Sequence, residues 1–174
     1  MLKRLLIVGA VVALVVLATV SVAAARKGGS DRPFTADLAG EVTFEFADYG
    51  AEPCGSYQVG GEFEDSGFSV ITHTEATGNA THLGKVQASF WHCPTDFGHD
   101  NGHLTLTAAN GDQVLIEYVD DGTTGDSFPI EVVDGTGRFT DATGSMILSY
   151  WLEPEEGFDV PWGWGATIEG TISY

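Results

Sequence analysis

The stretch Asp134-Gly-Thr-Gly-Arg-Phe-Thr-Asp-Ala-Thr-Gly144 decides the fold that we predict for this chain. Its glycines, Gly135, Gly137 and Gly144, permit positive φ angles, so the chain can reverse direction tightly there. Apolar residues alternate with polar ones on both sides of the stretch, at 128, 130 and 132 before it and at 146, 148, 150 and 152 after it. The stretch therefore predicts a turn between two β-strands, and no helix follows it as a phosphate-binding loop would require.

The same alternation extends outward in both directions and predicts eight strands. The pair Asn110-Gly111 is a strong hairpin signal, because both residues tolerate positive φ. Residues 76–79 resemble a turn between the second and third strands, and we predict no helix after residue 25. The expected strands cover 34–46, a run that begins at 68, 81–93, 104–108, 114–118, 128–132, 146–152 and 164–174.

Nearly every predicted strand has one apolar and one polar face, and most connections are short. A single antiparallel sheet that closes on itself buries all the apolar faces and leaves no exposed edge. The predicted fold class is therefore all-β, a single eight-stranded antiparallel β-barrel. A sandwich of two sheets is the alternative.

The N-terminal segment 1–25 has the pattern of a signal peptide. Lys3 and Arg4 precede an apolar run, and three alanines at 23–25 supply the small residues of a cleavage site. The alternative is an uncleaved membrane anchor, since the run approaches the roughly 20 residues that span a bilayer. We expect residues 26–33 to form a polar lead-in to one barrel domain over 34–174, and the protein to be secreted or held at the cell surface.

The chain is strongly acidic. It contains 25 acidic and seven basic residues, a net charge of −18, and two of the basic residues, Lys3 and Arg4, belong to the predicted signal peptide. Such a surface repels nucleic acid and anionic lipid, so we predict no nucleic-acid partner, and a membrane contact only through an uncleaved N-terminus. The acids are scattered along the chain, which favours a solubilising role.

Cys54 and Cys93 are the only two cysteines. An even pair in an exported protein predicts a disulfide bond, which would attach the glycine-rich segment 48–67 to the end of a later strand. A reactive or metal-binding thiol is the alternative.

Three motifs resemble a known family. They are His82-Leu-Gly-Lys85, Leu104-Thr-Leu-Thr-Ala-Ala-Asn-Gly-Asp112, and Gly135-Thr-Gly-Arg-Phe139 followed by Ala142-Thr-Gly144. In this order they resemble exported bacterial proteins with an allene oxide cyclase-like barrel, and plant dirigent proteins are similar in their Gly-Thr-Gly-x-Phe element. The resemblance implies a calycin-like, eight-stranded barrel with a central cavity, often assembled as a trimer. Enzymes of the family cyclise or steer small apolar molecules.

The interior faces favour binding over catalysis. The inward face of the strand 34–46 carries no acid or amide onto which a catalytic carboxylate of the family can be placed. We expect a small apolar ligand to contact Phe44, Phe90, His92, Tyr118, Tyr150 and Trp164. One alternative is an isomerase or cyclase that uses His82 or His92, and another is a structural interaction module of the cell surface. A barrel filled by its own aromatic side chains would contradict ligand binding.

No cofactor or metal is predicted. His82 and His92 share a strand face but lie ten residues apart, roughly 33 Å, so they cannot hold one ion. His99 is expected in a loop, and His103 on the threonine-bearing face of its strand. An aromatic cluster near the C-terminus could pack in the core or stack on a ligand, and it consists of Tyr150, Trp151, Phe158, Trp162 and Trp164.

Overall fold

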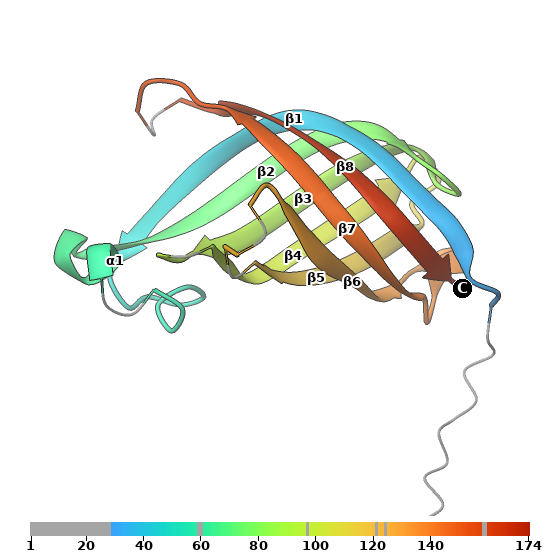
Figure 1. Ribbon diagram of the computed structural model, residues 1–174, viewed down its shortest axis with the longest axis horizontal. Coiled ribbons are helices and arrows are strands. Elements are labelled where there is room, and N and C mark those ends of the chain that lie inside the picture. Colours follow the sequence, from blue (N-terminus) through green and yellow to red (C-terminus); the bar gives the residue numbers. More distant parts are fainter. Residues whose placement is uncertain (1–28, 59–60, 97, 121, 124, 158–159) are drawn as a thin grey trace, which may run out of the picture.

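The chain folds into a closed barrel of eight antiparallel strands joined in sequence order (Figure 1). The computed structural model describes residues 29–58, 61–96, 98–120, 122–123, 125–157 and 160–174. Its strands are β1 (Arg32–Asp48), β2 (Phe68–Ala80), β3 (Gly84–Pro94), β4 (His99–Ala108), β5 (Gln113–Asp120), β6 (Ser127–Gly135), β7 (Thr143–Glu153) and β8 (Trp162–Ser173). The predicted fold class is confirmed. The predicted signal peptide, 1–25, lies outside the described residues.

The first and last strands close the sheet. β1 pairs along one edge with β2 and along the other with β8, where Arg32 lies opposite Ile172 and Val42 opposite Trp162. No strand edge in the described part of the chain is left outside the closed sheet. The alternative of two packed sheets is therefore wrong.

Two short helices lie in connections between strands, although the sequence predicted no helix. The helix α1 (Gly61–Ser66) precedes β2, and the 3-10 helix η1 (Gly137–Phe139) lies inside the glycine-rich turn between β6 and β7. Both are too short to produce an amphipathic period that the sequence analysis could detect. None of the helices that the structure describes is long and apolar enough to cross a membrane.

The turn predicted at 76–79 is wrong, because β2 continues without a break to Ala80. Gly78 lies so close to the neighbouring strand that a Cβ there would collide with the carbonyl oxygen of Asp37. The glycine therefore serves close strand packing and not chain reversal. The reversal comes at 81–83, where His82 has a φ of 67°.

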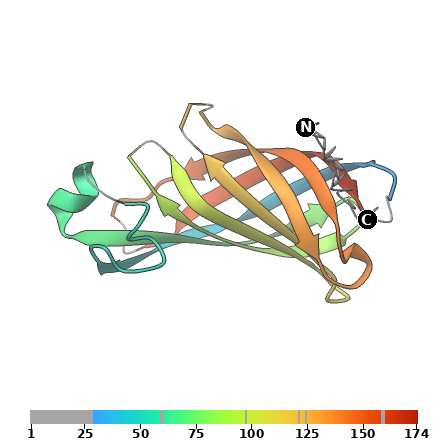
Figure 2. The same ribbon diagram turned by 90° about the horizontal axis from the view of Figure 1, so that it is seen from below.

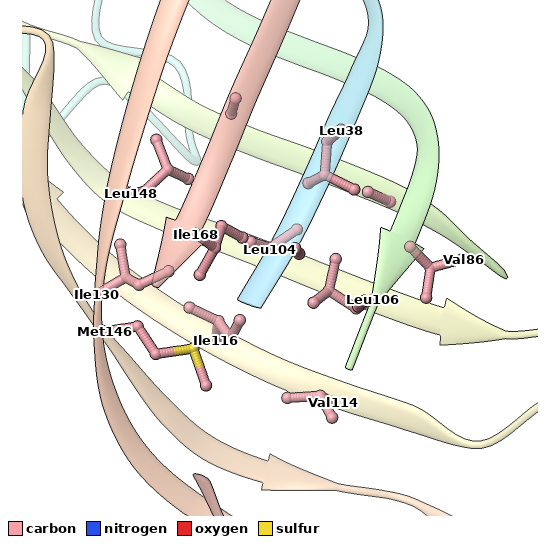
Figure 3. Packing of buried hydrophobic residues seen from close by; sticks show 14 of the residues in the cluster. Leu38, Val86, Leu104, Leu106, Val114, Ile116, Ile130, Met146, Leu148 and Ile168 are labelled. Atoms are coloured by element: carbon pink, nitrogen blue, oxygen red, sulfur yellow. The ribbon is translucent and has the colours of Figure 1, made fainter. Parts of the chain in front are cut away.

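One half of the barrel interior is filled with apolar side chains, most of them aliphatic. Alternate residues of every strand point inward, and those in Figure 3 interlock around the barrel axis. The largest fully buried members are Phe34, Phe139, Leu104, Leu106, Ile116, Ile130, Met146, Leu148, Ile168 and Ile172. This packed half is the hydrophobic core of the domain.

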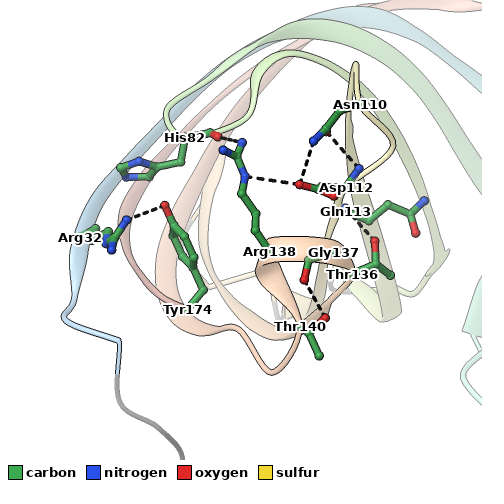
Figure 4. A network of polar contacts seen from close by, with 10 residues as sticks. All are labelled: Arg32, His82, Asn110, Asp112, Gln113, Thr136, Gly137, Arg138, Thr140 and Tyr174. Atoms are coloured by element: carbon green, nitrogen blue, oxygen red, sulfur yellow. Dashed lines mark hydrogen bonds and ion pairs between the residues drawn. The ribbon is translucent and has the colours of Figure 1, made fainter.

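The glycine-rich turn covers the end of the filled half. Gly137, with a φ of 60°, starts η1 and lets it place Phe139 in the core with no exposed surface. The guanidinium of Arg138 forms an ion pair with Asp112 at 3.5 Å and donates to the backbone carbonyl of His82 (Figure 4). The turn thus contacts the β2–β3 turn and the β4–β5 turn, and together they cover this end of the barrel.

A disulfide fixes the long connection between β1 and β2 at the opposite end. Cys54 and Cys93 are bonded with their Cα atoms 5.3 Å apart, as predicted. Between them the buried Gln58 accepts from the backbone N–H of Val70 and donates to the carbonyl oxygens of Val70 and Pro94, at 2.7–2.8 Å. The connection therefore packs on the outer face of β2 and β3, and α1 lies beyond it at the end away from the C-terminus (Figure 2).

Removal of this crosslink should destabilise the barrel. Loop closure over the 39-residue separation predicts that the variant Cys54→Ala/Cys93→Ala loses about 4 kcal/mol of unfolding free energy, measured by urea denaturation. Gln58→Ala is the matched control for the hydrogen bonds of the same segment. A double-cysteine variant as stable as the wild type would contradict the crosslinking role.

Candidate functional site

A pocket of about 170 Å³ occupies the half of the barrel that the aliphatic core leaves open. All eight strands contribute to its wall, since each places alternate side chains inside. The lining residues are Val42, Phe44, Thr72, Thr74, Phe90, His92, Pro94, His99, Tyr118, Phe128, Leu148, Tyr150, Leu152, Trp162 and Trp164. Other hollows lie on the outer surface, for example beside Thr77, Lys85 and Gln87, and their walls are more polar.

Aromatic pairs form the wall and floor of the pocket. Phe90 and Trp164 come from strands that are not neighbours, yet their ring centroids are 4.8 Å apart, so this pair spans the interior below the pocket. Phe44 packs on Trp162 at 4.9 Å with the ring planes at 70°. The edge-to-face contacts hold the two rings of each pair against one another. The pocket lies between the two pairs.

The structure brings together all six residues that the sequence analysis selected as ligand contacts. They surround one space, because they occupy inward positions on β1, β3, β5, β7 and β8. The lining also includes four residues that were not predicted as ligand contacts, namely Phe128, Trp162, Thr72 and Thr74. They occupy the same alternate positions of their strands as the inward-facing residues, and this alternation could have identified them. In the predicted aromatic cluster, Trp151 instead lies outside on Gly165, 51% exposed, and Phe158 lies outside the described residues.

The prediction that His82 shares the barrel interior with His92 is wrong. His82 lies in the β2–β3 turn at the closed end, where its Nε2 is 2.9 Å from the carbonyl oxygen of Pro33. The predicted strand began at residue 81, three residues before the start of β3 at Gly84, so the alternation was extended to His82 although this residue precedes the strand. His82 therefore has no access to the pocket.

His92 and Tyr118 form a polar pair on the pocket wall. The Nδ1 atom of His92 lies 2.8 Å from the phenolic oxygen of Tyr118. Burial, with Asp120 and Tyr150 nearby, raises the pKa of Tyr118 far above its usual value, so the phenol keeps its proton. Burial lowers the pKa of His92 well below 6.5, and the neighbouring His99 and His73 lower it further. The phenol can thus donate to Nδ1 of a neutral imidazole whose proton is on Nε2.

His99 belongs to the same site, although the sequence analysis placed it in a loop. It is the first residue of β4, and its ring centroid lies 4.1 Å from that of His92. Between His99 and Gly102 the strand contains one more residue than its partner β5, and Asn101 there has a φ of 50°. This β-bulge reverses the side-chain parity and turns His99 into the barrel. Alternation alone cannot reveal such a position.

A buried carboxylate faces His99. The Oδ2 atom of Asp120 lies 3.4 Å from Nδ1 of His99, and Oδ1 accepts the backbone N–H of Gly122 at 2.9 Å. Burial lowers the pKa of His99, while the charge of Asp120 acts in the opposite direction. Among the described residues, Nδ1 of His99 is the only buried side-chain nitrogen or oxygen without a hydrogen-bond partner.

The remaining chemistry of the pocket is uncharged. Among the described residues, its lining contains no lysine, arginine, aspartate or glutamate. The part of the chain that the structure describes holds no group of three or more His, Cys, Asp or Glu side chains arranged for a metal ion. Tyr150, whose pKa is raised by burial and by Asp120 and Asp126, adds a second neutral phenol at the rim.

Comparison with known proteins gives a likeness in structure alone. No family model and no curated protein matches the sequence. Among solved structures, the pterocarpan synthase dirigent protein GePTS1 is similar at a TM-score of 0.49 and 11% identity, over 84% of this chain and 93% of that chain. At this distance the likeness carries no argument about activity, so the function has to be inferred from the pocket itself.

The buried histidines predict a loss of stability on acidification. Because the folded-state pKa of His92 and of His99 is lowered, the unfolded chain binds more protons than the folded one below about pH 6.5. Their stabilising contribution is complete above that pH and disappears as the pH falls through the lowered pKa values. Each unit of pKa difference is worth about 1.4 kcal/mol.

His92→Gln should therefore flatten the dependence of unfolding free energy on pH, measured by urea denaturation between about pH 7.5 and about pH 5. His82→Gln makes the same chemical change at the closed end and serves as the control. Identical pH slopes in the wild type and His92→Gln would contradict a neutral, buried His92.

Proposed function

We propose that this protein binds a small, uncharged and mainly apolar molecule in the pocket at the open end of its barrel. The observation that carries the proposal is the aromatic lining that all eight strands place around an unfilled space of about 170 Å³. Apolar concave sites with a few polar groups are the usual form of small-molecule sites.

The volume limits the size of the ligand. A cavity of about 150 Å³ with apolar walls is large enough for benzene, whereas sites for drug-sized ligands have roughly 300–1,000 Å³. The pocket here therefore fits one or two rings or a short branched chain. The polar groups His92, His99 and Tyr118 lie at one place on the wall, so a ligand with a single oxygen atom at one end matches the pocket best.

A purely structural role is the competing function, and the unfilled interior argues against it. A module that acts only through its outer surface gains nothing from an open pocket, since filling it with side chains would add stability. The aromatic side chains that could have filled the barrel pack edge-to-face against one another instead. The distribution of large side chains thus supports a ligand-binding role.

The binding experiment is an NMR titration with naphthalene, observed through the ¹⁵N-labelled indole groups. The resonances of Trp162 and Trp164 should shift, while that of the outward-facing Trp151 should not. Thr72→Phe places a ring in the pocket and should weaken binding about tenfold, the equivalent of about 1.4 kcal/mol. Thr77→Phe, the same change on the outer face of β2, is the matched control. No shift at either pocket tryptophan would refute the proposal.

We also propose that the protein acts outside the cytoplasm. The disulfide supports this location, because such bonds persist in oxidising compartments, and so does the signal-peptide pattern of residues 1–25. Native mass spectrometry of the exported protein should give the mass of residues 26–174 less two hydrogen atoms, together with a small molecule that leaves on unfolding. A chain that retains residues 1–25 would instead support a membrane anchor.

A further inference from the structure

We propose that the pocket is also a site of proton transfer, in which His99, oriented by Asp120, removes a proton from the carbon next to the carbonyl group of a small apolar ketone. The inference rests on the proposed function, since the ketone would occupy the same pocket. It assigns a catalytic role to His99, a positioning role to Asp120 and a hydrogen-bonding role to His92.

Asp120 orients His99 so that this histidine can accept a proton. A carboxylate next to Nδ1 favours the imidazole tautomer with its proton on Nδ1, which leaves Nε2 as a free proton acceptor. The carboxylate is held in place, because Asp120 is 4% exposed and accepts the backbone N–H of Gly122. The Nδ1–Oδ2 distance of 3.4 Å is longer than a good hydrogen bond, and such contacts commonly tighten when a ligand binds.

His92 has the complementary role of a hydrogen-bond donor. The Tyr118 hydroxyl next to Nδ1 of His92 favours the tautomer with its proton on Nε2, so His92 is a hydrogen-bond donor. The two imidazole centroids are 4.1 Å apart, so one small ligand can contact both. One ring can thus accept a proton while the other stabilises the oxygen on which negative charge develops.

The surroundings of the two histidines favour proton transfer near neutral pH. Burial keeps both imidazoles neutral near pH 7, and the charge of Asp120 partly restores the basicity that His99 loses by burial. In the described part of the chain, the titratable groups that act on the two rings are Asp120, Tyr118, Tyr150 and, for His92, also His73. The apolar walls lower the effective dielectric constant around the pair, which strengthens the hydrogen bonds to the developing charge.

The proposed step requires no additional reactant. The C–H bond next to the carbonyl breaks as an N–H bond forms at Nε2 of His99. The released electron pair forms a carbon–carbon double bond, and the carbonyl pair moves to oxygen, which accepts a hydrogen bond from Nε2–H of His92. When the imidazolium N–H of His99 exchanges its hydrogen with solvent, return of a proton to the same carbon regenerates the ketone with a solvent hydrogen. Return of the proton to a conjugated position gives an isomer.

The test uses the intact chain and 2-tetralone, a bicyclic apolar ketone, in D₂O. Proton NMR follows the loss of the hydrogens next to the carbonyl, and the wild type should accelerate this exchange above the rate in buffer. His99→Gln should reduce the acceleration about a hundredfold, the lower part of the range for general acid–base catalysis. His82→Gln, an equal change outside the pocket, should exchange as the wild type does.

The variant Asp120→Asn distinguishes an effect of Asp120 on His99 from a role in stabilising the fold. The rate should rise with pH as His99 loses its proton, and loss of the raising effect of Asp120 should move the midpoint of that rise to lower pH. An unmoved midpoint would contradict the role of Asp120.

The other outcomes are also decisive. If 2-tetralone displaces naphthalene but exchanges no faster than in buffer, or if His99→Gln exchanges as fast as the wild type, proton transfer is refuted and the binding function stands. If neither compound binds, both proposals fail.

Discussion

The closure of the sheet by the pairing of β1 with β8 is the constraint on which the rest of the structure depends. A strand buries one face only if something covers that face, and in this chain each strand is covered by the strands across the barrel. β1 is the longest strand, with 17 residues, and it pairs with β2 and β8 over most of its length. Closure of the sheet thus provides hydrogen-bond partners for the backbone groups at the strand edges and encloses an interior at the same time.

The two halves of the barrel interior are packed differently, because one holds the hydrophobic core and the other the pocket. At the closed end, η1 inserts Phe139 and the aliphatic side chains of several strands fill the space, so this half supplies stability. At the open end, the side chains are rings that contact one another in pairs, and the pair Phe90 and Trp164 separates the two halves. The disulfide and Gln58 then hold the longest described connection on the outside of the barrel, beside this end.

Burial of the polar groups at the open end lowers the stability of the fold, yet the structure keeps them in a specific arrangement. Tyr118 satisfies one nitrogen of His92, whereas His99 is left with an imperfect contact to a buried carboxylate. Buried groups of this kind usually occur where function outweighs stability. The outer surface shows the opposite chemistry, since the whole chain carries a net charge of −18, whereas the residues that the structure describes in the pocket lining include no Asp or Glu.

The sequence by itself determined the strands, the closed antiparallel sheet, the disulfide pair and six inward residues of the pocket, because period-two alternation and glycine-rich turns are local signals. Only the tertiary structure decided which half of the barrel is filled, since packing depends on side chains from strands far apart in the chain. It alone revealed that Gly78 serves a close strand approach, that His82 lies in a turn, and that a bulge turns His99 toward Asp120. A single extra residue in one strand reverses the direction of every side chain beyond it. The position of that residue depends on how the strand pairs with its neighbour, which the sequence of one strand does not show.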